Sequence, residues 1–250
     1  MFSRMFAGEL PESAAKGFKA RMEAWRALSP EQKSAESERI EQLEKAQREA
    51  EAELRTKARR DRLRALSGIG SRFAGALLTD LDWAGNEPAR TAAMAALSTR
   101  SGWFYGAVGA GKTHIAAAVV ADAINHDREA ILISGLAMLS RIKSSYDDAG
   151  LVKLECVDVV GRLSRSPVLA LDDLGKERFT PWAAEQFMLL IDARYRAKLP
   201  LLVTSNFTPR ELERHWAANG MDAAYGPALV RRIVSMTGTP VQVHARKGAA

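Results

Sequence analysis

The segment Gly106–Thr113 has residue types and a spacing that suit phosphate binding. It reads Gly-Ala-Val-Gly-Ala-Gly-Lys-Thr and satisfies the pattern G-x-x-x-x-G-K-[ST], with an apolar segment before it and an amphipathic one after it. The glycines let backbone N–H groups turn towards phosphate oxygens, and a helix that begins near Lys112 directs the positive end of its dipole at them. We expect Lys112 to reach the β- and γ-phosphates and the Thr113 hydroxyl to ligate Mg²⁺. The predicted nucleotide contacts are Gly106, Ala107, Val108, Gly109, Ala110, Gly111, Lys112, Thr113 and His114. The sequence therefore predicts a chain that binds ATP and Mg²⁺ and hydrolyses ATP.

Two acidic residues follow another apolar segment, about sixty residues further along the chain. Val168–Leu171 is fully apolar, as a buried central strand is, and Asp172 and Asp173 come directly after it. Open α/β sheets bind ligands at the carboxyl ends of their strands. We expect Asp172 to hold the Mg²⁺ shell and Asp173 to orient and polarise the attacking water, although a pair of acids can also cap a helix. Glu177 lies four residues after Asp173 and can share this charge role.

A third apolar segment also ends in polar groups. Leu201–Thr204 is followed by a serine and then by Asn206. At the tip of a strand, Asn206 can bond the γ-phosphate or the attacking water. Asparagine also ends strands because it suits turns, so this assignment depends on the two motifs described above.

The three motifs lie where strand and helix patterns alternate, which indicates a parallel sheet with crossover helices. The expected strands are Ser101–Tyr105, Ala130–Ser134, Val168–Leu171, Leu201–Thr204 and Val241–His244. The expected helices are His114–Asn125, Leu136–Tyr146, Pro181–Arg196, residues 210–217 and Leu229–Ser235. The predicted fold class is α/β, with the strands flanked by helices.

The first 65 residues differ from the rest of the chain. Ser29, Pro30 and Gln32 have the types and spacing of a helix start, and Pro30–Leu66 reads as one long helix with a thin apolar stripe. Near its end, a cluster of basic residues has only Asp61 as a counter-charge. The members of that cluster are Arg55, Lys57, Arg59, Arg60, Arg62 and Arg64. They suit either a solvated helix face or a contact with nucleic acid or a partner. We expect residues 1–67 to form a helical partner-binding region and residues 68–250 an ATPase domain.

Composition narrows the class of protein. The chain has 250 residues, 47% of them hydrophobic and 26% charged, which suits one globular domain and a smaller appendage. Its single cysteine excludes an internal disulfide. No apolar run is long enough to span a bilayer, so we expect a cytoplasmic protein without membrane contact. A net charge of +6 and a pI of about 9.6 are compatible with binding nucleic acid.

From about Gly68 to Val243 the sequence resembles the AAA+ subfamily of DnaC-type helicase loaders and IstB-type transposition helper ATPases. The segments that carry the resemblance are Gly68–Phe73, Gly111–Ala118, Leu171–Glu177, Ile191–Arg196, Val203–Asn206 and Ala228–Ile233. These motifs do not separate the two branches of the subfamily.

The resemblance implies an ATP site at a subunit boundary, and therefore self-association into ATP-dependent oligomers. The neighbouring subunit would supply an arginine finger, for which Arg232 matches best and Arg231 is the alternative. The resemblance also implies that the segment after the second strand binds single-stranded DNA. Arg141 and Lys143 would contact phosphates there and Tyr146 would stack on a base, although the same residues fit an ordinary exposed helix.

Three functions remain open at this point. The preferred one is a loader that grips a DnaB-type replicative helicase with its N-terminal helices and delivers it to single-stranded DNA, with ATP hydrolysis as the switch. The alternative is a transposition helper that assembles on duplex DNA with a transposase. The third is an adaptor whose main work is protein binding.

Overall fold

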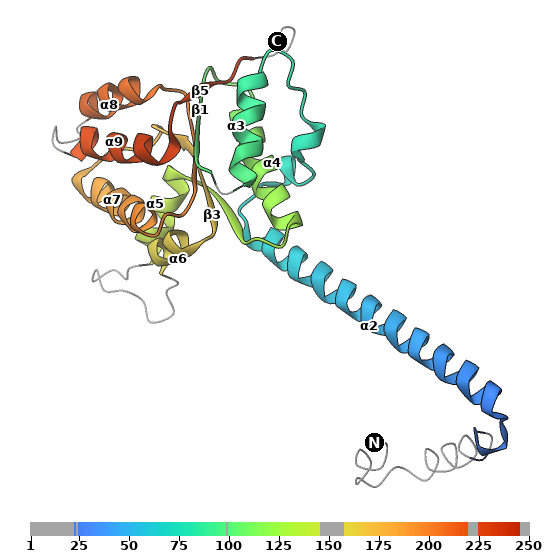
Figure 1. Cartoon of the computed structure of the whole chain (residues 1–250). Helices are drawn as coiled ribbons and strands as arrows, with labels where there is room; N and C mark the ends of the chain where they lie inside the picture. The colour runs from blue at the N-terminus through green and yellow to red at the C-terminus, as the bar shows by residue number, and fades with distance from the viewer. Residues whose placement is uncertain (1–22, 24, 99, 146–157, 220–224, 246–250) are drawn as a thin grey trace. The chain divides into compact units, whose positions relative to one another are not determined.

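The computed structural model describes residue 23 and residues 25–98, 100–145, 158–219 and 225–245 (Figure 1). The chain divides into two compact units, residues 1–57 and residues 58–250, and each is described by itself. Within the described residues, no helix combines the length and apolar character that a membrane span needs.

Helix α2 (Pro30–Leu66) has the bounds that the sequence predicts. Its start is held by a reciprocal pair of bonds: the Gln32 backbone N–H donates to Ser29 Oγ at 3.2 Å, and the Ser29 N–H donates to Gln32 Oε1 at 2.9 Å. None of its residues is buried. Ion pairs one turn apart lie along the exposed surface, such as Arg48 with Glu44 at 3.2 Å. Up to residue 57 the helix therefore relies on its cap and on ion pairs within itself rather than on a hydrophobic core.

The sheet of the second unit has five parallel strands in the order β2-β3-β4-β1-β5. The strands are β1 (Gly102–Tyr105), β2 (Ala130–Ser134), β3 (Val168–Leu174), β4 (Leu201–Ser205) and β5 (Val241–Gln242). The predicted α/β fold is confirmed. Strand β3 continues three residues beyond its predicted end, so Asp172 and Asp173 lie within the strand and not in a loop after it.

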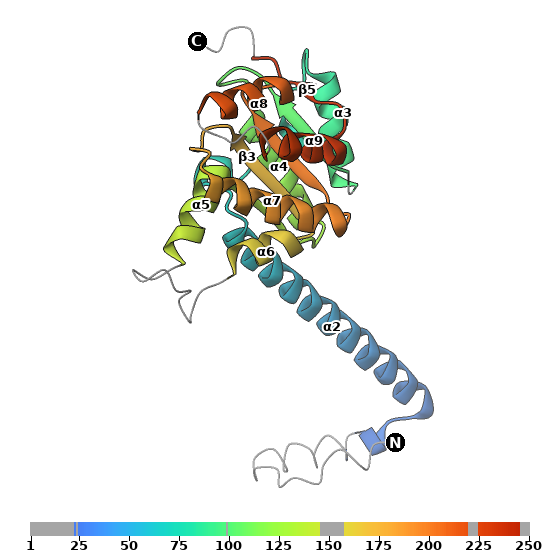
Figure 2. The same ribbon diagram turned by 90° about the vertical axis from the view of Figure 1, so that its left-hand side faces the viewer.

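Helices cover both faces of this sheet (Figures 1 and 2). The helices of the second unit are α3 (Glu87–Leu97), α4 (Lys112–Asn125), α5 (Gly135–Ser144), α6 (Val159–Arg165), α7 (Pro181–Arg196), α8 (Pro209–Ala218) and α9 (Tyr225–Thr237). Two short 3₁₀ turns, η2 (Ser71–Phe73) and η3 (Leu78–Asp80), precede α3. The sequence pattern does not predict α3, α6 or these turns, because short alanine-rich or mixed segments carry little periodicity.

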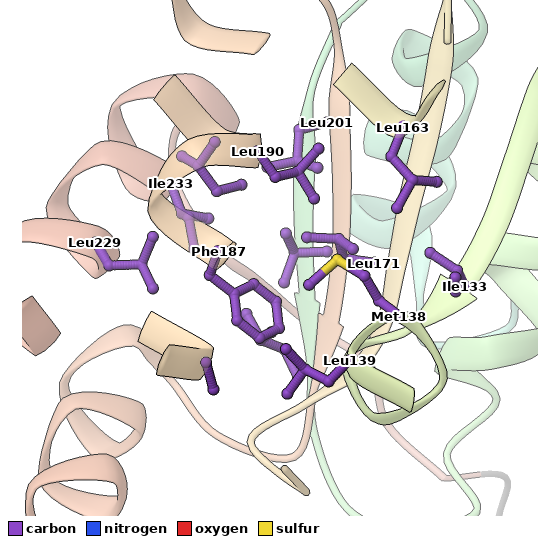
Figure 3. Close-up of a cluster of buried hydrophobic side chains, with 14 of the residues drawn as sticks. Ile133, Met138, Leu139, Leu163, Leu171, Phe187, Leu190, Leu201, Leu229 and Ile233 are labelled. Atoms are coloured by element: carbon purple, nitrogen blue, oxygen red, sulfur yellow. The ribbon is translucent and has the colours of Figure 1, made fainter. Parts of the chain in front are cut away.

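Two hydrophobic clusters attach the helices to the sheet. One contains side chains of α5, α7, α8 and α9, including Phe187 and Ile233 (Figure 3). The other contains α3 and the alanine-rich α4. Neighbouring residues of β1 divide between them: Trp103 packs in the first cluster and Phe104 in the second. Because successive side chains of a strand point to opposite faces of the sheet, the two aromatic rings are buried in different clusters. An aromatic strand can therefore precede the phosphate loop.

A fully buried arginine joins three segments of the second unit. Arg194 on α7 donates from its guanidinium to the backbone carbonyls of Leu163 at 2.6 Å, Ser166 at 2.8 Å and Pro200. Burial lowers the pKa of Arg194 to about 10. The arginine thus satisfies carbonyls near the end of α6 and before β4, which would otherwise be buried without donors.

The last turns of α2 belong to the second unit. Arg60 donates to both carboxylate oxygens of Asp127, at 3.0 and 2.9 Å, and Arg64 donates to Asn125 at 2.6 Å. The hydrogen bond with Arg60 lowers the pKa of Asp127. The unit therefore begins at Ala58, inside α2, whereas the sequence analysis placed the boundary after residue 67.

Candidate nucleotide-binding site

A cleft of about 420 Å³ lies where the phosphate loop meets the segment before α3 and the tips of β3, β4 and β5. Because all five strands are parallel, their carboxyl ends meet at this edge. Residues from each predicted motif line the cleft: Val108, Gly109, Ala110, Gly111, Lys112, Thr113, His114, Asp173 and Asn206. The fold thus brings together segments that lie up to a hundred residues apart in the sequence.

The phosphate loop connects β1 to the start of α4. Gly106, Gly109 and Gly111 have φ values of +148°, +81° and +95°, which side chains rarely allow. The ammonium of Lys112 is buried and donates to the carbonyls of Gly106 at 2.9 Å and Ala107 at 2.8 Å. Burial lowers the pKa of Lys112, against the attraction of Asp173 and Asp172. The lysine is therefore a cation with little water around it, which strengthens its interaction with an anion.

Thr113 and Asp172 are the residues that would hold Mg²⁺ beside this cleft, and their oxygen atoms lie close together. The Thr113 hydroxyl lies 3.0 and 3.1 Å from the two carboxylate oxygens of Asp172. At this separation both oxygens would be able to hold one Mg²⁺ ion, which would neutralise phosphate charge. Burial raises the pKa of Asp172, and hydrogen bonds from Thr204 and Thr113 oppose that rise by favouring the ionised form. The donor set is oxygen only, which is the preference of Mg²⁺.

Asp173 is held in a left-handed backbone conformation with φ of +57°. Its N–H donates to the Thr204 hydroxyl at 2.9 Å, and its carboxylate accepts a bond from Lys176 Nζ at 2.6 Å. Thr204 also donates to Asp172, at 2.5 Å. One threonine of β4 therefore fixes both acids of β3, which sends Asp172 towards Thr113 and Asp173 into the cleft.

Glu177 is not among the residues that line the cleft. It is buried, and both of its carboxylate oxygens accept from the Gly175 N–H at 3.1 Å. Burial raises its pKa to about 7. A methyl group on Gly135 would lie 3.0 Å from Glu177 and Phe187. The structure thus puts Glu177 against the turn that follows β3, between that turn and the start of α5.

The cleft has a further wall that the sequence motifs do not predict. It consists of Phe73, Trp83, Asn86 and His244 with neighbouring residues. The rings of Phe73 and His114 lie 5.5 Å apart, and the Asn86 side chain exchanges two hydrogen bonds with the backbone of His244, at 2.8 and 3.2 Å. Apolar and aromatic groups with a few polar contacts suit a nucleotide base. The only sequence signal for this wall is the segment Gly68–Phe73.

The two candidate arginine fingers lie on α9, and neither lines the cleft. Arg232 forms an ion pair with Asp192 on α7, and its guanidinium lies 5.2 Å from the centre of the Tyr195 ring. Arg231 donates to the Pro227 carbonyl at 3.2 Å. Their position away from this subunit's own cleft leaves the finger role as a prediction about a neighbouring subunit.

The predicted DNA contacts lie on α5. Arg141 is exposed, and Lys143 places its ammonium 5.2 Å from the centre of the Trp182 ring on α7. Tyr146 lies outside the described residues. The ring contact accounts for Lys143 within the fold, so Arg141 is the better candidate for a phosphate contact.

The fold and the site define an AAA+ P-loop ATPase: a phosphate loop between β1 and α4, paired with an acidic β3, in a parallel sheet of order β2-β3-β4-β1-β5. The chain belongs to the family of IstB-like ATP binding proteins, whose sequence profile matches residues 17–245. This confirms the predicted subfamily.

Known relatives and structures agree with this assignment. The chain is 28% identical over 115 residues to the replicative helicase loader DnaI of Bacillus subtilis, and the match covers 46% of this chain and 35% of that protein. The chain therefore matches about a third of the length of this curated relative. A crystal structure of DnaI is similar with a TM-score of 0.62 and 20% identity, over 74% of this chain and 98% of that one. The structure of the DnaC helicase loader has a TM-score of 0.55 and 21% identity, over 70% and 100% of the two chains. At these identities the structures show a shared fold.

Proposed function

We propose that this ATPase is a replicative helicase loader, which engages a DnaB-type helicase and single-stranded DNA and uses ATP hydrolysis as its switch. The cleft lined by the phosphate loop and the tips of three strands supports the ATP-dependent part of this proposal, and the similarity to a replicative helicase loader carries the choice of partner. The curated relative, a replicative helicase loader, favours this reading over other ATP-driven switches.

Within this proposal each group of the cleft has a separate task. Lys112 binds the β- and γ-phosphates, and Thr113 and Asp172 hold Mg²⁺, which neutralises phosphate charge. Asp173 orients and polarises the attacking water, and Asn206 bonds the water or the γ-phosphate. Asp173 and Asn206 both line the cleft, as these roles require.

Two substitutions separate binding from turnover. Lys112→Ala should abolish ATP binding, because the phosphates lose a buried cation. Asp173→Asn should preserve binding and stop hydrolysis, because the amide cannot attract a proton from water. Nucleotide affinity is measured with a fluorescent analogue and turnover by phosphate release. Equal affinity of the wild type and Lys112→Ala would contradict the assignment.

We also propose that Arg232 acts in a neighbouring subunit's cleft. An arginine finger is worth on the order of 10³–10⁵ in rate, so Arg232→Ala should bind ATP and hydrolyse it poorly. To act in trans, the guanidinium must leave Asp192, which holds it within its own subunit. Arg231→Ala removes the same charge from the adjacent position of α9 and should leave turnover near that of the wild type. Loss of turnover in Arg231→Ala alone would assign the finger to Arg231 instead.

Mixing variants tests whether the site is shared. Arg232→Ala mixed with Lys112→Ala should regain turnover, because an intact cleft of one subunit then meets an intact finger of the other. Specific activity of the wild type should rise with protein concentration. The mixture is assayed with and without a helicase, since a partner can be needed for assembly. Inactivity under both conditions, with each variant folded, would contradict a shared site.

The N-terminal region is proposed to bind the helicase. Helix α2 buries none of its residues, so its surface is available to a partner. A fragment of residues 58–250 keeps the ion pair of Arg60 with Asp127 and should remain a folded ATPase. It should not capture a DnaB-type helicase, whereas the full chain should. Capture by the fragment would move the partner site to the ATPase unit.

Single-stranded DNA binding should require ATP and weaken with salt. Each phosphate contact on a single strand contributes about −0.7 to the slope of log K against log salt. Arg141→Ala should therefore reduce that slope by about this amount, and Lys143→Ala should change it less because its ammonium faces Trp182. Fluorescence anisotropy over a salt series measures both slopes. Equal slopes for Arg141→Ala and the wild type would remove α5 from the proposed interface.

The second candidate function is a transposition helper that acts on duplex DNA with a transposase. The observation that favours it is the family match itself, which covers residues 17–245. Competition between single-stranded and duplex oligonucleotides of equal length separates the two functions. ATP-dependent preference for duplex, together with binding to a transposase, would replace the loader proposal.

A further inference from the structure

Lys176 is a cation in the cleft whose role the phosphate-binding motifs do not explain. It follows β3, lines the cleft together with Lys112 and Asn206, and keeps 55% of its side chain exposed. Its Nζ lies 2.6 Å from Oδ2 of Asp173, the acid assigned to the attacking water. The lysine therefore neutralises the acid that hydrolysis would use.

The backbone around Lys176 is firmly held on both sides. Gly175 has φ of +109°, and a methyl group there would lie 2.8 Å from Leu212 and 2.9 Å from Phe207. On the other side of Lys176, Glu177 is buried, and both of its carboxylate oxygens accept from the Gly175 N–H. The loop thus has little freedom, and any rearrangement at this point falls to the long, exposed side chain of Lys176.

The two lysines of the cleft differ in what holds them. Lys112 is 6% exposed and donates to two backbone carbonyls, which fixes it within the loop. Lys176 has one ion pair, in which both side chains are partly exposed to water. Exposed ion pairs are weak and exchange readily, whereas a terminal phosphate offers several charged oxygens. An ATP molecule in the cleft can therefore draw Lys176 from Asp173.

We propose that Lys176 senses the γ-phosphate. With ADP or no nucleotide, it pairs with Asp173 and keeps that carboxylate occupied. With ATP, its ammonium donates to the terminal phosphate, and Asp173 becomes free to accept a hydrogen bond from the attacking water. The second half of this exchange rests on the proposed role of Asp173. The first half requires only a nucleotide in the cleft.

Nucleotide affinities test the first half. Lys176→Ala should weaken binding of AMPPNP by roughly tenfold. This is the contribution of a charge-assisted hydrogen bond to the γ-phosphate, minus that of the exposed ion pair with Asp173 that is lost when it forms. Binding of ADP should change by less than about twofold, because ADP has no γ-phosphate. Lys176→Arg should retain most of the preference for AMPPNP. Arg178→Ala is the matched control: Arg178 is an exposed cation of the same loop that does not line the cleft, and neither affinity should change. Equal effects of Lys176→Ala on both nucleotides, or none, would overturn the proposal.

A double-mutant cycle tests the exchange itself. Asp173→Asn removes the carboxylate that competes for Lys176, so it should raise AMPPNP affinity more in the wild type than in Lys176→Ala. Additive effects would mean that Lys176 does not pass between the two partners. This readout is independent of turnover. If Asp173→Asn still hydrolyses ATP while the cycle shows coupling, the role given to Asp173 fails and the sensor remains.

Discussion

Gly106→Ala should destabilise the protein far more than Gly109→Ala, although both glycines belong to the same phosphate-binding pattern. A methyl group on Gly106 would lie 2.3 Å from the carbonyl oxygen of Val243, well inside van der Waals contact. A methyl group on Gly109 would meet no atom within 4 Å. The two residues therefore differ in packing, and both have a positive φ.

The segment that approaches Gly106 follows β5 directly and is held by hydrogen bonds. The Val243 N–H donates to the Tyr105 carbonyl at 2.7 Å, and the next residue, His244, exchanges two hydrogen bonds with Asn86. Overpacking costs about 1–3 kcal/mol and backbone strain about 1–3 kcal/mol, so Gly106→Ala should lose about 2–6 kcal/mol. Gly109, with φ of +81°, lies closer to the left-handed helical region, where strain is smaller, so Gly109→Ala should lose about 1–2 kcal/mol.

Urea unfolding without nucleotide measures this difference, because affinity for ATP will fall in both variants. The m-value should stay close to that of the wild type if the two variants unfold from the same fold. Equal unfolding free energies for the two variants would refute the reasoning, since they would show that Val243 moves away from Gly106 at no cost.

Three further substitutions test other parts of the structure. The pKa of Glu177 is raised from 4.5 to about 7, so the folded protein holds a proton that the unfolded chain releases, and stability should fall as pH rises through this window; Glu177→Gln should flatten that slope and exceed the wild type by up to about 3 kcal/mol at about pH 8, as measured by urea unfolding. Arg194→Met leaves three buried carbonyls without donors and should cost about 3–5 kcal/mol in the same assay, whereas a loss below about 1 kcal/mol would mean that water replaces the guanidinium. Asn86→Ala breaks both bonds to His244 and should cost about 1–2 kcal/mol and weaken nucleotide binding several-fold by fluorescence titration, while unchanged affinity would exclude this wall from the site.

Several features of the protein follow from the sequence because their signals are local. The bounds of α2 follow from the Ser29 cap, the proline after it and the unbroken polar run, all within one segment. The phosphate loop follows from the fixed spacing of its glycines, lysine and threonine. The strands follow from apolar runs, whose carboxyl ends must meet at one edge once the sheet is parallel. Asp173 and Asn206 were therefore expected in the same cleft, and both line it.

The partners of individual side chains were decided only by the tertiary structure. Glu177 has the spacing of a catalytic acid, but the turn at Gly175 directs it beneath the loop, where burial raises its pKa. Lys176, one residue earlier, was not a candidate in the sequence, and the same turn brings it to Asp173.

The two glycines of the phosphate loop show why this limit is physical. The sequence determined that Gly106 and Gly109 share a loop, because a spacing pattern is a property of neighbouring residues. It did not determine that Val243 approaches Gly106 alone, since that contact joins residues 137 positions apart through the closing of the sheet by β5. Patterns of neighbouring residues specify elements and their order, whereas the contacts that set charge, strain and pKa arise only when distant elements pack together.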